Sequence, residues 1–99
     1  MYYTAARGWI DDMLSEGKLK DLSREELDAL AREYSAKLEN FFQEEVTLLL
    51  EKMGKGKEYE RMLLYDGQYA NKYLNQTIPG FPAFRMEVFE KARKIITGQ

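Results

Sequence analysis

The hydrophobic residues of this chain recur at steps of three and four, which is the spacing of one face of an α-helix. The longest such run starts at Leu27 and stops before Gly54. Its apolar members are Leu27, Leu30, Ala31, Tyr34, Leu38, Phe41, Phe42, Val46, Leu49, Leu50 and Met53. No segment alternates with the period of two that is typical of a strand. The pattern therefore predicts an all-α fold: a compact bundle of four to five helices with one long central helix, about residues 23–53.

The beginning of this long helix carries a capping box over Ser23–Glu26, in which each of the two end residues satisfies the backbone amide of the other. A continuous helix over residues 24–53 would be about 45 Å long at ~1.5 Å per residue. A compact chain of this size has a radius of gyration of only about 13 Å. The helix must therefore protrude, bend or be covered by a partner chain. Asn40 is the weakest helix former in its middle, so a break, if the helix has one, is expected there.

Four shorter helices are expected around the long one. They are predicted at Thr4–Glu16, Lys57–Tyr65, about Gln68–Asn75 and Pro82–Thr97. Thr4 is placed to cap the first of these, Gly17 to end it, and Asp66 to cap the third. Pro79 forces Ile78 into extended geometry, so the last helix begins after it. Inward-facing side chains are expected at Trp9, Tyr59, Met62, Leu63, Tyr65, Phe84, Val88, Phe89, Ala92, Ile95 and Ile96.

The composition excludes several classes of catalytic chemistry. The 99 residues include no cysteine and no histidine, so zinc ligation, thiol catalysis and histidine general-base chemistry are absent. The adjacent carboxylates in the helices diverge by about 100° and cannot converge on one substrate atom. These pairs are Asp11-Asp12, Glu25-Glu26 and Glu44-Glu45. No catalytic residue, cofactor, metal site or small-molecule substrate is predicted, and the chain is interpreted as a non-enzyme.

The charge is uneven along the chain although the net charge is only −2. Residues 1–53 carry 7 Lys/Arg and 12 Asp/Glu, a net of −5, and residues 54–99 carry 8 and 5, a net of +3. The two halves could attract one another within a chain or between chains, although salt screens the effect. No apolar run reaches the ~18 residues that span a bilayer. A single cytoplasmic domain over residues 1–99, with no membrane association, is the expectation.

Tyrosines are the most informative candidates for a binding site. Tyr65, Tyr69 and Tyr73 are spaced i, i+4, i+8, so one helix through all three would align them on one face. Tyrosine is enriched in protein interfaces, which makes these residues a candidate partner-binding edge. Basic residues expected near this edge are Arg61, Lys72 and Arg85. The alternative is a core lined by tyrosine rings whose hydroxyls reach water. A stacking platform for single-stranded nucleic acid is disfavoured, because too few cations accompany the rings.

The order of these features resembles a known family. A short helix leads into Leu19–Glu26, a long leucine-rich helix follows, and Tyr73-Leu74 precedes Ile78-Pro79-Gly80-Phe81 and a last helix with Glu87. Over about residues 9–97 this is similar to a family of small uncharacterised bacterial helical proteins, known only as a domain of unknown function. The resemblance implies a helical fold and no catalytic residue.

Three functions are compatible with this pattern. The favoured one is a non-enzymatic helical protein–protein interaction module, self-associating as a homodimer or acting as an adaptor, because the amphipathic segment exceeds what one small domain can cover. The alternative is a small phage-type inhibitor that blocks a defence nuclease or another enzyme. The third is a nucleic-acid- or ribosome-associated factor that binds through the basic second half. The exposure of the tyrosines is the observation that bears most directly on the first.

Overall fold

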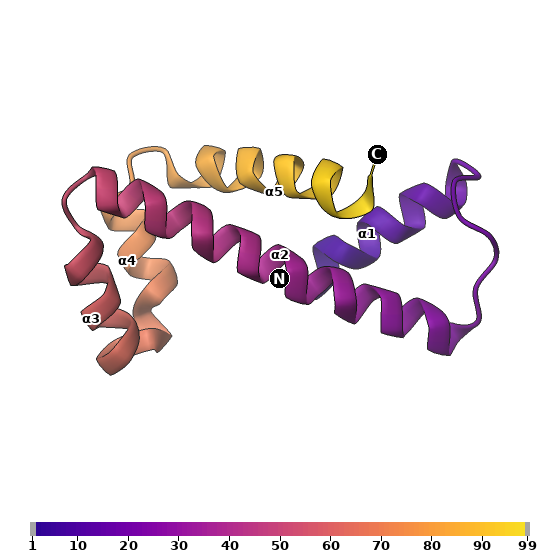
Figure 1. Cartoon of the computed structure of the whole chain (residues 1–99), viewed down its shortest axis with the longest axis horizontal. Helices are drawn as coiled ribbons and strands as arrows, with labels where there is room; N and C mark the ends of the chain where they lie inside the picture. Colours follow the sequence, from indigo (N-terminus) through magenta and orange to yellow (C-terminus); the bar gives the residue numbers. More distant parts are fainter. Residues whose placement is uncertain (1, 99) are drawn as a thin grey trace. The chain divides into compact units, whose positions relative to one another are not determined.

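The computed structural model describes residues 2–98. Within them the chain forms five α-helices and one short 3-10 helix, with no strand (Figure 1). The elements are α1 (Tyr2–Ser15), α2 (Arg24–Lys52), α3 (Gly56–Asp66), η1 (Gly67–Tyr69), α4 (Ala70–Thr77) and α5 (Phe81–Thr97). The predicted all-α class, the number of helices and the long helix are confirmed.

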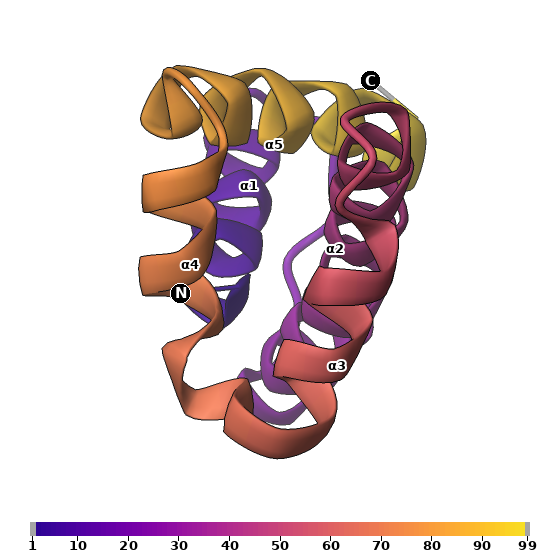
Figure 2. The same cartoon turned by 90° about the vertical axis from the view of Figure 1, so that its left-hand side faces the viewer.

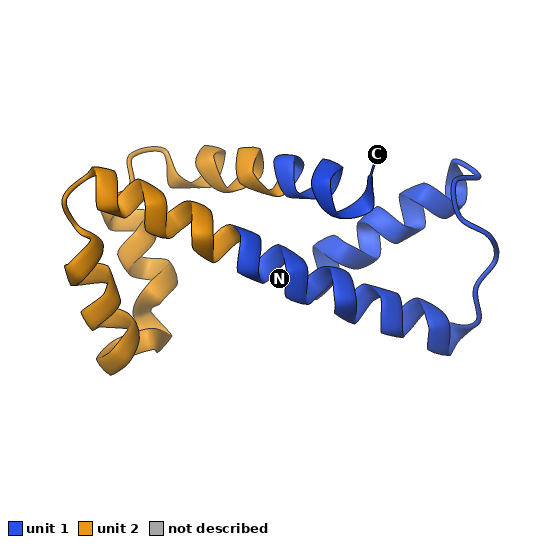
Figure 3. Ribbon diagram, viewed as in Figure 1, with its two compact units in different colours: residues 1–41, 90–99 blue, residues 42–89 orange. Residues whose placement is uncertain are grey.

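The contacts within the chain define two compact units (Figure 3). Unit 1 consists of residues 1–41 and 90–99, and unit 2 consists of residues 42–89. Both α2 and α5 pass from one unit into the other. The part of α2 up to Phe41 therefore packs within unit 1, and the part from Phe42 onward packs within unit 2.

The capping box at the start of α2 is confirmed. The Ser23 amide donates to Oε1 of Glu26 at 3.0 Å, and the Glu26 amide donates to Oγ of Ser23 at 3.2 Å. The hydrogen bond from the Ser23 amide is the main reason that the pKa of the Glu26 carboxyl lies below its usual value. Two amides that the helix cannot satisfy internally thus receive side-chain acceptors.

Replacing the cap residue, Ser23→Ala, is expected to lower the free energy of unfolding by about 1 kcal/mol. A lowered carboxyl pKa stabilises the fold at neutral pH, and this stabilisation is lost as the pH falls through the folded-state pKa. Alanine keeps the amide that is the main cause of the lowered pKa and removes only the hydroxyl, so the pKa of Glu26 should rise slightly, as an NMR titration would show. Ser35→Ala, inside α2, is the control and should leave both quantities nearly unchanged or raise stability slightly. Equal effects of the two changes would contradict the prediction.

The long helix has no break at Asn40, because α2 is one uninterrupted helix from Arg24 to Lys52. Asn40 is exposed, so its weak helix propensity costs only a few tenths of a kcal/mol. Leu38 and Phe42 on either side of it are buried. Burial of these large side chains outweighs the local preference of one asparagine.

Gly17 and Gly54 end helices as left-handed caps. Gly17 has φ +73°, and Gly54, which follows α2, has φ +75°. After Gly54, the Lys55 amide donates to the Leu50 carbonyl at 2.8 Å, and the Gly54 amide donates to the Glu51 carbonyl at 3.0 Å. This pair of bonds is the Schellman motif. It requires a residue with positive φ, which glycine adopts without steric strain. The prediction of Gly17 as a stop is confirmed.

In unit 1, the buried cluster joins α1 to the first half of α2. Its members are Ile10, Met13 and Ala31, packed against Leu14, Leu19, Leu27, Leu30 and Tyr34. The Tyr3 hydroxyl donates to Oδ1 of Asp28 at 2.8 Å, which ties α1 to α2 at the surface. One prediction for α1 is wrong, because Thr4 lies inside the helix and does not cap it. Trp9 is partly buried, and it lies outside this cluster.

In unit 2, three phenylalanine rings meet where α2 faces the beginning of α5. Phe42 lies edge-on to Phe81, with ring centroids 6.2 Å apart, and to Phe89, at 5.6 Å. Ile78 is extended before Pro79, as predicted, and is buried. The other buried residues of this core are Val46, Leu50, Tyr59, Leu74 and Val88.

Several side chains that were expected to face inward do not. Ile95 of α5 is 65% exposed, and Leu63 and Tyr65 of α3 are exposed as well. Asp66 makes no capping hydrogen bond, and α4 begins only at Ala70. The departures in α3 matter most, because they create an apolar surface on unit 2.

Candidate functional site

The three tyrosines proposed as one face lie on three different elements. Tyr65 belongs to α3, Tyr69 to η1 and Tyr73 to α4, and these elements form a helical hairpin with η1 at its closed end (Figure 2). Asp66 has φ −139° and ψ 43°, which is outside the helical region, so the helical register is lost between Tyr65 and Tyr69. No single helix runs through all three tyrosines, so the condition for their alignment on one face is not met.

Tyr73 belongs to the internal packing of unit 2. Its ring stacks on Tyr59, with centroids 5.9 Å apart and an interplanar angle of 19°. Its hydroxyl donates to Oε2 of Glu58 at 3.1 Å, and burial followed by this bond raises the pKa of Tyr73. The Tyr59 hydroxyl donates to Oε1 of Gln43 at 2.8 Å. The tyrosine pair thus fastens α3 to α4 on one side and to α2 on the other.

The end of α3 presents large apolar side chains to solvent. Leu63, Leu64 and Tyr65 are consecutive and are 40%, 75% and 79% exposed, and Tyr69 in η1 is 53% exposed. We call these four residues the α3 ridge. Single exposed hydrophobics are ordinary on protein surfaces, but four large ones within residues 63–69 are a concentration that indicates a candidate interaction site.

The three predicted basic residues are placed differently with respect to the ridge. Arg61 is exposed on α3 and precedes Tyr65 by four residues, which places the two side chains on one helix face. Lys72 is exposed on α4, and Arg85 is half-buried on α5. Of the three, only Arg61 therefore shares an element with part of the ridge, and it lies on the same face of α3 as Leu64 and Tyr65.

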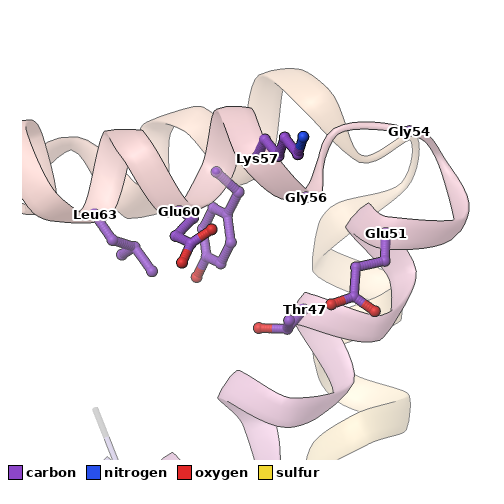
Figure 4. Close-up of a pocket in the computed structure, with 8 residues that line it drawn as sticks. Thr47, Glu51, Gly54, Gly56, Lys57, Glu60 and Leu63 are labelled. Atoms are coloured by element: carbon purple, nitrogen blue, oxygen red, sulfur yellow. The ribbon is translucent and has the colours of Figure 1, made fainter.

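A hollow of about 640 Å³ lies in the angle between the end of α2 and α3 (Figure 4). Its lining residues are Thr47, Glu51, Gly54, Gly56, Lys57, Tyr59, Glu60 and Leu63. The turn between the helices determines this angle, and Gly56 permits a close approach. A Cβ atom at Gly56 would lie 3.0 Å from Cγ of Glu51.

A second hollow, of about 460 Å³, continues the first along α2. It shares Thr47 with the first hollow and adds Gln43, Glu44 and Leu48. Leu48 is 54% exposed, so its side chain forms an open apolar wall. We call the two hollows together the α2–α3 groove.

The groove combines apolar walls with an acidic rim. Figure 4 shows Thr47 and Glu51 pointing into the angle from α2, and Glu60 and Leu63 pointing into it from α3. Lys57 also lines the hollow, but its ammonium group points away from these side chains in the same view. Together with Glu44, three carboxylates thus border a groove whose walls include two exposed leucines.

Neither the ridge nor the groove was recognised in the sequence, although signals were present. The four residues Met62–Tyr65 are all apolar, and four consecutive residues of a helix cannot all face one core. Leu48 lies off the inward stripe of the long helix, which also marks it as a surface residue. Reading these departures from periodicity would have located the ridge and the exposed Leu48, but not the groove itself, which depends on the angle between α2 and α3.

The described residues offer no constellation typical of a catalytic centre. Within residues 2–98, no group of three or more acidic residues could hold a metal ion. No helix over the same residues is long and apolar enough to cross a membrane. The residues of the pairs Asp11-Asp12 and Glu25-Glu26 are exposed on helix surfaces.

Comparison with known proteins adds no relationship: no family model, no curated protein and no solved structure matches this chain.

Proposed function

We propose that this chain is a non-enzymatic helical protein–protein interaction module that binds through unit 2. The observation that carries the proposal is the α3 ridge, where Leu63, Leu64 and Tyr65 are exposed one after another. Burying these side chains against a partner would remove apolar surface from water, at about 25 cal/mol per Å². The adjoining α2–α3 groove supplies the concave and polar part of such a surface.

The alternative function, an inhibitor that imitates DNA, has less support. Such a protein needs a continuous acidic surface. Here acidic residues alternate with basic partners in short-range ion pairs along the helices. These pairs are Arg7–Asp11, Asp28–Arg32 and Glu33–Lys37. This intermixing favours a binding surface with an apolar centre over one defined by charge.

The test is capture of binding proteins by ridge and control variants. Three tagged baits are compared in extracts of the source cells: the wild-type chain, the double variant L64D/Y65D and the control I95D. Untagged wild-type chain is added to each extract, so that a second copy of this chain can also be captured. Ile95 is a matched control because it is also an exposed hydrophobic but lies in unit 1. We expect wild type and I95D to retain the same protein, and L64D/Y65D to retain at least tenfold less, because two carboxylates oppose burial of the ridge.

Circular dichroism is the folding control. L64D/Y65D should keep the helix content of the wild type, because Leu64 and Tyr65 are both exposed. If wild type retains no protein, or if L64D/Y65D and I95D retain as much as wild type, the proposed function is wrong.

A further inference from the structure

We infer that the partner of the α3 ridge is the α2–α3 groove of a second copy of this chain, so that two copies form a reciprocal two-fold dimer. This inference rests on the proposed function and names its partner. It requires that the ridge and the groove complement one another in charge and in polarity.

Charge is the first element of this complementarity. Arg61 is exposed beside the ridge and has no ion pair with any other described residue. The groove presents the carboxylates of Glu51 and Glu60, with Glu44 further along α2. A guanidinium group brought to this rim would gain charge-assisted hydrogen bonds that neither surface has in a single copy.

Apolar surface is the second element. Leu64 and Tyr65 project from the end of α3 with more than 70% of their surface exposed. The groove offers Leu48 and Leu63 as exposed apolar walls and a combined space large enough for side chains of this size. An apolar centre with charged groups at its edge is the usual composition of a specific interface.

The arrangement is also reciprocal. The ridge and the groove share α3, and Leu63 belongs to both. When the ridge of one copy enters the groove of the other, a two-fold axis brings the second ridge to the first groove. Such an interface is closed, so association stops at two chains and leaves neither surface open for further growth.

The test is a charge exchange between two variants. In R61E the ridge becomes acidic, and in E51K/E60K the groove becomes basic. Each variant alone should be monomeric, because its ridge and groove repel one another, whereas an equimolar mixture should form heterodimers. In the mixture the Arg61 of one chain meets a wild-type groove, and the Glu at position 61 of the other meets lysines.

Light scattering on the wild-type chain should give twice the mass of one chain, which is 11.6 kDa. R61E and E51K/E60K should each raise the dissociation constant of the dimer roughly tenfold or more. Each variant is then monomeric at a concentration at which the wild-type chain is still dimeric. The mixture, and the triple variant R61E/E51K/E60K, should recover dimers. K20E carries the same charge change as R61E on an exposed residue of unit 1, and it should stay dimeric.

Recovery in the mixture supports the inference even where a single variant is less stable, because a misfolded chain would not recover. A monomeric wild type overturns it, and so does a dimer that R61E leaves intact or that the mixture fails to restore. A monomeric wild type that still retains another protein through the ridge overturns the second copy as partner and leaves the proposed function standing. A monomer that retains nothing overturns both.

Discussion

Replacing Phe42 by alanine should lower the free energy of unfolding by about 3–5 kcal/mol. Phe42 is only 3% exposed and its ring makes edge contacts with Phe81 and Phe89. The substitution removes a buried ring from the core of unit 2 and leaves a cavity that α2 and α5, held by their other contacts, cannot close. A chain of this size is typically stable by only about 5–15 kcal/mol, so most of its stability is at risk.

Urea denaturation followed by circular dichroism measures this loss, and Phe42→Leu is the control. Leucine keeps most of the volume and apolar surface, so it should cost clearly less than alanine. Met86→Ala, at an exposed position of the same unit, should cost well under 1 kcal/mol. A Phe42→Ala variant as stable as Met86→Ala would show that the three-ring cluster does not hold unit 2 together.

Proline at position 40 should destabilise the chain by about 3 kcal/mol or more. This loss of stability comes from the backbone alone. Asn40 is exposed, so removal of its side chain costs no buried contact. Within the continuous α2, proline lacks the amide that bonds to the carbonyl four residues earlier, and its ring collides with that carbonyl. If α2 were broken at Asn40, the same substitution would be tolerated.

Asn40→Ala is the matched control and should raise stability by a few tenths of a kcal/mol, since alanine is the better helix former. Thermal unfolding by circular dichroism compares the two variants. A proline variant within about 0.5 kcal/mol of wild type would contradict the continuity of α2 and restore the break that asparagine alone suggested.

The features that the sequence predicts well are those decided within a few residues. The capping box depends on Ser23 and Glu26 alone, and the first helix stop depends on the freedom of Gly17 to adopt positive φ. The extended backbone at Ile78 follows from the ring of Pro79. In each case the interacting groups are near neighbours in the chain, so no knowledge of the tertiary fold is needed.

Features that depend on distant packing were predicted less well. A break at Asn40 follows from propensity, but burial of Leu38 and Phe42 keeps α2 whole. Conversely, Tyr65 fits a helical stripe, but α3 has no partner on that side within unit 2. Helical spacing tells which residues share a face, and it does not tell whether another element covers that face.

The candidate site could be predicted only in part. Tyr65, Tyr69 and Arg61 were singled out by residue type and spacing, and the structure leaves all three exposed. The groove was beyond reach because it exists only through the angle that the turn at Gly54 and Gly56 gives to α3. A shape produced by two helices and a turn has no signature in the periodicity of either helix.

The division of the chain into two units has a consequence for the order of folding. Unit 2 is one continuous segment, residues 42–89, whereas unit 1 joins residues 1–41 to residues that follow unit 2. Contacts between near neighbours close short loops and form quickly, and in unit 1 these are the contacts of α1 with the first half of α2. On the ribosome, α1 can therefore pack on the first half of α2 early, and unit 2 is complete before unit 1, which still lacks the last turns of α5.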